Sequence, residues 1–130
     1  MHTLSRRMLL LVLVVLLPVA AYAAPPVENI EGSPIPSGAS LDEIFKAMVV
    51  GSVNRGWILK EIEPGHAEAT IYVRSHMAKV DIRYDQSTYS ITYNDSENLK
   101  YNPEKGTIHK SYNKWVATLN MDIQRAFALL

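Results

Sequence analysis

The chain has 130 residues, of which 48% are hydrophobic and 20% are charged, and its 13 basic and 13 acidic residues cancel. This balance gives no electrostatic drive towards DNA or RNA, so nucleic-acid binding is not expected. The length and the hydrophobic content suit a single globular domain with its own core. The sequence contains no cysteine, which excludes disulfides and the lipid-bearing cysteine of a bacterial lipoprotein.

Residues 1–23 have the three parts of a secretory signal peptide. Arg6 and Arg7 form a charged head, residues 8–17 are an apolar run, and residues 21–23 read A-x-A. The run is shorter than the roughly 20 apolar residues that a membrane span needs. We therefore expect cleavage near Ala23, a periplasmic or secreted protein, and no permanent membrane anchor afterwards. The paired arginines also suit a twin-arginine signal, so the sequence leaves the export route open between that route and the general secretory one.

Residues 24–39 have the composition of a flexible linker. Four prolines, two glycines and two serines fall within this short segment. Such a composition is typical of irregular chain, so no ordered secondary structure is expected here. Residues 40–130 are then expected to form the single domain.

A first helix is expected to begin at Ser40 and to stop at Gly56. Ser40 and Glu43 have the spacing of a capping box, in which each side chain satisfies a backbone donor near the other. Apolar residues then recur with a period near 3.6, at Leu41, Ile44, Phe45, Met48, Val49 and Val53. Gly51 weakens this helix by about 1 kcal/mol relative to alanine. We expect it to allow close contact with a strand.

Residues 57–94 change to a two-residue alternation of apolar and polar side chains. This rhythm, with short turns, is typical of antiparallel strands that bury one face and expose the other. About four strands are expected, at residues 57–63, 67–74, 78–84 and 88–94. Residues 94–106 are expected to form a loop. The solvent-facing row is expected to include Glu68, Thr70, Tyr72, Arg74, Lys79, Asp81, Arg83, Ser90 and Thr92.

A final helix is expected over residues 111–129. Its apolar stripe consists of Tyr112, Trp115, Val116, Leu119, Ile123, Ala126, Phe127 and Leu130. The predicted fold class is α+β, with an antiparallel sheet of about four strands. The N-terminal and C-terminal helices are expected to pack on one face of that sheet, because each has one apolar stripe to bury.

The residues that could carry chemistry are few. His66, His76 and His109 lie in predicted turns or at element ends, and none has a partner at metal-ligand spacing, so neither metal nor cofactor is expected. Residues 95–98 offer several oxygen donors but lack the glycine and the final glutamate of the twelve-residue calcium loop, which leaves calcium binding undecided. The chain has no G-x-S-x-G motif and no phosphate-cradling glycine loop.

The aromatic and polar stretch from residue 84 to residue 115 is the most distinctive part of the chain. Its phase assigns five of its aromatic residues to the core: Tyr84, Tyr89, Tyr93, Tyr112 and Trp115. Asp95, Asn98, Tyr101 and His109 remain free to contact a partner, and tyrosine suits recognition surfaces. These four are the predicted partner-binding residues.

Several short runs within the second half of the chain resemble a family of small exported proteins and lipoproteins of Gram-negative bacteria. The matching runs include Tyr84-Asp85, Tyr89-Ser90-Ile91, Asp95-Ser96, Asn98-Leu99, Ile108-His109, Tyr112-Asn113 and Trp115-Val116. The resemblance covers about residues 56–119. It implies an envelope location and a fold of two helices and a sheet. It implies no established activity and no catalytic residues, and this chain lacks the cysteine that lipid-anchored members would carry.

Three functional hypotheses follow from the sequence. The leading one is a non-enzymatic periplasmic protein that binds an envelope protein or a cell-wall polymer. The first alternative is an inhibitor of a cell-wall hydrolase, which would insert the loop 94–106 into an active-site cleft. The second alternative is a small hydrolase or lyase that uses His109 with Asp95 or Glu97, provided that these side chains converge.

Overall fold

The computed structural model describes residues 11–16 and 23–130. The predicted charged head and most of the predicted cleavage motif lie outside the described residues. The elements are β1 (Ile30–Pro34), α1 (Leu41–Val53), β2 (Ile58–Glu63), β3 (His66–Val73), β4 (His76–Tyr84), β5 (Thr88–Glu97) and α2 (Lys110–Phe127). One five-stranded antiparallel sheet has the strand order β1-β5-β4-β3-β2. The predicted α+β class is confirmed.

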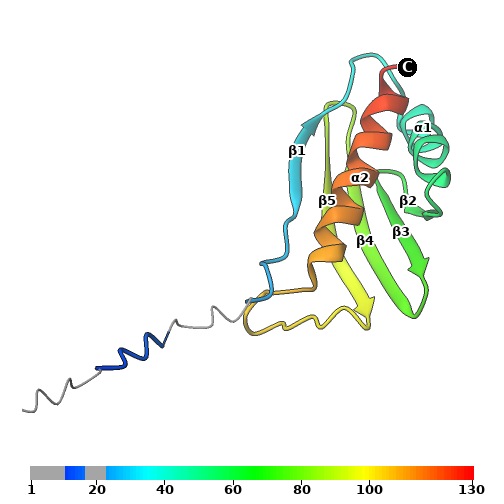
Figure 1. Ribbon diagram of the computed structural model, residues 1–130. Coiled ribbons are helices and arrows are strands. Elements are labelled where there is room, and N and C mark those ends of the chain that lie inside the picture. The colour runs from blue at the N-terminus through cyan, green and yellow to red at the C-terminus, as the bar shows by residue number, and fades with distance from the viewer. Residues whose placement is uncertain (1–10, 17–22) are drawn as a thin grey trace, which may run out of the picture.

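Both helices lie on the same face of this sheet (Figure 1). The capping box predicted for α1 is present, because the Glu43 amide donates to Ser40 Oγ at 3.1 Å and the Ser40 amide donates to Glu43 Oε1 at 3.4 Å. The helix ends at Val53, three residues before Gly56. Within the described residues, no helix is long and apolar enough to cross a membrane.

The core lies between the sheet and the two helices, as the alternation predicts. Val80 and Ile82 of β4 are fully buried, and so is Tyr112 of α2, whose ring makes an edge contact with Tyr93 of β5. The buried residues of α2 also include Val116, Leu119, Ile123 and Phe127, which belong to the predicted stripe. The last member of that stripe, Leu130, is instead 46% exposed, because α2 ends at Phe127.

The fifth strand comes from the segment expected to be a flexible linker, and the expectation of no ordered structure there is wrong. In β1, Ile30 pairs with Ile91 and Pro34 pairs with Thr88 of β5. Proline lacks the amide donor that an inner strand needs, but an edge strand tolerates it. The proline-rich composition gave no indication of β1, because an edge strand needs backbone hydrogen bonds to a neighbouring strand on one side only.

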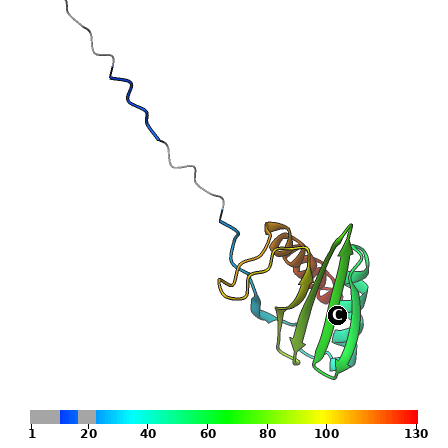
Figure 2. The ribbon, with the colours of Figure 1, turned by 90° about the horizontal axis from the view of Figure 1, so that it is seen from below.

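Residues 25–29 are also fastened to the domain. The Ile108 amide donates to the Pro25 carbonyl at 3.0 Å, and the Val27 amide donates to the Gly106 carbonyl at 2.8 Å. The side-chain amide of Asn113 in α2 donates to the Pro26 carbonyl at 2.9 Å. Figure 2 shows the loop 98–109, in gold, beside this part of the chain.

Two of the predicted strands, 78–84 and 88–94, were too short. β4 begins at His76 directly after a tight turn, in which Arg74 has a positive φ of 57°. β5 continues to Glu97, because a bulge keeps the pairing with β4 going. Val80 pairs with Tyr93 and Lys79 pairs with Asp95, so one extra residue is accommodated between them. The segment expected to be a loop from residue 94 is therefore partly strand.

Candidate functional site

A groove forms on the helical face because the two helices differ in length. α1 has 13 residues and α2 has 18, which at 1.5 Å per residue makes them about 20 Å and 27 Å long. α1 packs against the second half of α2, where Gly51 meets Asp122 (Figure 1). Beside the first half of α2, the inner face of the sheet is left without a helix over it.

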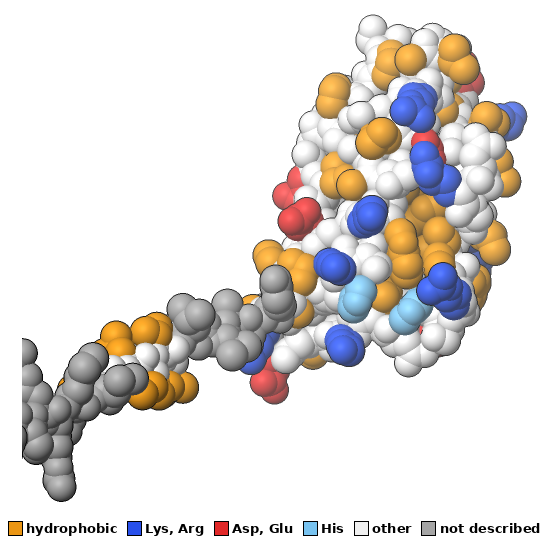
Figure 3. Space-filling view, viewed as in Figure 1, with side chains coloured by type: hydrophobic (Ala, Val, Ile, Leu, Met, Phe, Trp, Pro, Cys, Tyr) orange, Lys and Arg blue, Asp and Glu red, His pale blue; other side chains and the backbone are white. Residues whose placement is uncertain are grey.

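The groove has a volume of about 440 Å³, which lies within the range typical of small-molecule sites. Its floor is formed by the apolar side chains of Trp57 and Ile71. These residues are nearly buried, at 3% and 5% exposed. Trp115 of α2 forms part of the wall and is only partly buried. The complete lining is Arg55, Trp57, Ile71, Val73, Ser111, Lys114, Trp115 and Thr118. Figure 3 shows hydrophobic side chains on this face, bordered by lysine and arginine side chains.

Arg55 is held in place by a buried carboxylate. It follows α1 just before Gly56, whose φ of 89° turns the chain towards β2. Its Nε donates to Asp122 Oδ2 at 2.7 Å, and the Asp122 side chain is only 10% exposed. The other oxygen of Asp122 lies 3.7 Å from Arg125 Nη1. Within the described residues, the terminal nitrogens of Arg55 make no hydrogen bond, so they are available to a ligand.

Lys114 supplies the second positive charge of the groove. Its side chain is exposed and has no ion-pair partner among residues 23–130. No aspartate or glutamate belongs to the lining. The groove therefore combines an apolar floor, one accessible indole ring, the ammonium of Lys114, unpaired within residues 23–130, and the terminal nitrogens of Arg55, whose charge is shared with Asp122. This arrangement favours an anionic ligand with an apolar face.

None of the four residues predicted to bind a partner lines this groove. The Tyr101 ring stacks on Tyr93, with ring centroids 4.1 Å apart and planes inclined by 25°, and it is 38% exposed. The exposed carboxylate of Asp95 accepts the Ser96 amide at 2.8 Å. Asp95 and Tyr101 are thus engaged within their own strand and loop.

Asn98 and His109 have structural roles. The Asn98 side-chain amide donates to the Ser75 carbonyl at 2.7 Å, and its own carbonyl contacts His76 Nδ1 at 2.8 Å. His109 is the N-cap of α2, where its Nδ1 accepts the Ser111 amide at 3.1 Å. No hydrogen bond or ion pair joins His109 to Asp95 or Glu97 in the described part of the chain.

His66 is the first residue of β3, and its side chain is paired and partly buried rather than solvated. Its Nε2 lies 2.7 Å from Asp81 Oδ1 on the helix-free face of the sheet, and the two side chains are only 18% and 13% exposed. Partial burial acts to raise the pKa of Asp81, but hydrogen bonds from His66 and from Asn94 Nδ2 outweigh it and hold that pKa below its usual value. At the centre of the expected solvent-facing row, Asp81 thus connects His66 and Asn94 through hydrogen bonds.

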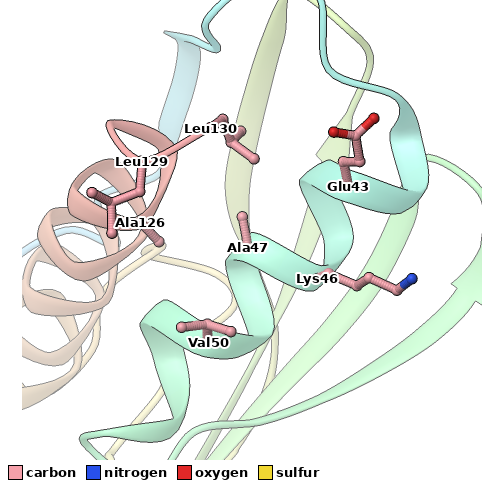
Figure 4. A pocket seen from close by; sticks show the side chains of 7 residues that line it. All are labelled: Glu43, Lys46, Ala47, Val50, Ala126, Leu129 and Leu130. Carbon is pink, nitrogen blue, oxygen red and sulfur yellow. The ribbon is translucent and has the colours of Figure 1, made fainter.

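A second hollow lies between α1 and the end of α2 (Figure 4). It has a volume of about 330 Å³ and a mainly apolar lining that includes Val50, Ala126 and Leu129. The ammonium of Lys46 at its border lies 2.8 Å from Asp42 Oδ2, so that charge is already paired. This hollow has fewer groups that could orient a ligand than the groove has.

Sequence reasoning missed the groove because its lining residues come from three separate segments, 55–57, 71–73 and 111–118. One signal was present: Asp122 occupies a position within the apolar stripe of α2, between Leu119 and Ile123. A buried acid requires a cationic partner, and that requirement points to a nearby arginine. Nothing in the sequence indicates that Trp57 would approach Trp115.

Among the described residues, no three histidine, aspartate or glutamate side chains gather in a way that could hold a metal ion. Comparisons with protein-family models, with curated proteins and with solved structures find no match to this chain.

Proposed function

We propose that this protein is an exported binding module that holds a cell-wall polymer in the groove between α2 and β3. The observation that carries the proposal is a preformed hollow containing both tryptophans of the chain and a lysine without a partner in the described residues. Tryptophan offers a large apolar face with one donor, and charged groups set the orientation of a ligand. The signal-like sequence of residues 1–23 supports a periplasmic or secreted location for such a module.

The proposal is for binding without catalysis. General acid–base chemistry is carried mainly by histidine and carboxylate side chains, and neither type lines the groove. Lys114 is exposed to solvent, whereas lysines that serve as bases or nucleophiles are typically buried. The lining suits holding a ligand better than transforming it.

Sedimentation with purified cell-wall sacculi tests this function. The mature protein is expected to sediment with the sacculi, and Trp115→Leu is expected to remain in the supernatant. Tyr72→Leu serves as the matched control, because Tyr72 is an aromatic residue on the helix-free face with 68% of its surface exposed. Equal sedimentation of the two variants, or none by the parent protein, would contradict the proposal. Release of soluble wall fragments by the parent protein would contradict its non-enzymatic part.

A further inference from the structure

We infer that the groove recognises a carboxylate-bearing saccharide, with Lys114 and Arg55 facing the carboxylate and Trp115 facing the sugar ring. This inference rests on the proposed function and names the chemistry of its ligand. The inference is drawn from two observations: the chemical groups that line the groove together, and the partners that those groups already have within the protein.

The anionic part of the ligand follows from the charges. Both ionisable side chains of the lining are cationic. Arg55 is paired with Asp122, which lies outside the lining, so Lys114 is the cation of the groove that has no ion-pair partner among the described residues. Arg55 is pre-oriented, because its Nε is fixed on the buried carboxylate of Asp122 at 2.7 Å. The remaining face of a guanidinium can donate two parallel hydrogen bonds to a carboxylate. Preorientation also reduces the entropy lost on binding.

The saccharide part follows from the walls. A sugar ring has a face of C–H groups that packs on the negative face of an aromatic ring, and its edge carries hydroxyls. Trp115 presents such a ring beside Lys114, and Trp57 and Ile71 keep the floor apolar. The hydroxyls of Ser111 and Thr118 lie on the same wall. A purely apolar acyl chain would offer no partner to the ammonium of Lys114, and burying that charge unpaired under the ligand is unfavourable.

A titration of the mature protein with two disaccharides tests the inference. The first probe is N-acetylglucosaminyl-N-acetylmuramic acid, which carries a lactyl carboxylate, and the second is neutral di-N-acetylchitobiose. We expect the carboxylate probe to bind about tenfold more tightly, since one charge-assisted hydrogen bond supplies at least that ratio. Lys114→Gln is expected to remove most of the difference. Lys60→Gln, an exposed lysine paired in register with Glu68 on the other face, is expected to leave it unchanged.

The possible results distinguish a failure of this inference from a failure of the proposed function. If both disaccharides bind equally and Lys114→Gln changes neither, the carboxylate assignment is wrong, while binding to sacculi still stands. If a tri-glutamate peptide binds and neither disaccharide does, the ligand is an acidic peptide and the saccharide assignment is overturned. If the parent protein binds neither sacculi nor any of the three probes, the proposed function itself is wrong.

Discussion

Replacing Gly51 by alanine should destabilise the protein, although alanine is the better helix former. A Cβ atom at this position would lie 2.7 Å from the Asp122 carbonyl oxygen and 3.1 Å from the Ala126 Cβ. The first of these contacts is with backbone, so α1 and α2 must move apart. Overpacking of this kind costs about 1–3 kcal/mol, while the gain in helix propensity is at most about 1 kcal/mol. The expected net loss is up to about 2 kcal/mol.

Urea unfolding of the parent and of Gly51→Ala measures this loss directly. Ala117→Gly is the matched control, because Ala117 is exposed in the middle of α2 and its replacement reports the propensity effect alone. The Gly51→Ala variant is also expected to bind the wall less well, since Asp122 holds Arg55. An increase in the free energy of unfolding for Gly51→Ala would refute the reasoning, because it would show that the helices separate without penalty.

Three further changes test other parts of the fold. Ser40→Ala removes the cap on the Glu43 amide, and urea unfolding should show a loss of about 1 kcal/mol; an unchanged midpoint would argue against the capping box. The pKa of Asp81 is lowered in the folded state, so the ionised carboxylate of Asp81 stabilises the fold. This stabilisation is under about 1 kcal/mol for a pair near the surface. It is present above about pH 4 and is lost as the pH falls through the lowered pKa. Asp81→Asn should therefore be less stable than the parent at pH 7, with the gap closing below pH 4, and a gap that does not depend on pH would contradict this. Tyr101→Ala breaks the stack on Tyr93 and should cost about 0.5–1.5 kcal/mol without weakening binding to sacculi. Loss of sedimentation would instead support the prediction that Tyr101 contacts the partner.

The helices and the inner strands follow from local patterns, and those patterns could be read from the sequence. The two-residue alternation in β4 buries Val80 and Ile82 as expected. The capping spacing at Ser40 marks the true start of α1. In these segments the local preference and the burial of one face agree, so nothing in the tertiary structure overrides them.

The features that the sequence did not reveal depend on contacts between distant segments. β1 exists because β5 offers a free edge, and a proline-rich segment gives no local sign of that pairing. Gly51 was expected to approach a strand, but it approaches α2 instead. A glycine inside a helix signals a close neighbour without indicating which element supplies it. The groove likewise depends on the difference in length between α1 and α2, which becomes a hollow only after both helices are packed.

The chain contains only two tryptophans, and both line the groove. Their two indole N–H signals in a ¹H–¹⁵N correlation spectrum therefore report on this site without any mutation. On titration with soluble wall fragments, the Trp115 signal should move in proportion to occupancy, while the backbone amides of Thr70 and Lys79 in the middle of the sheet should stay in place. Movement of those sheet amides with both indole signals unchanged would show that the ligand binds elsewhere, and the groove would lose its assigned role.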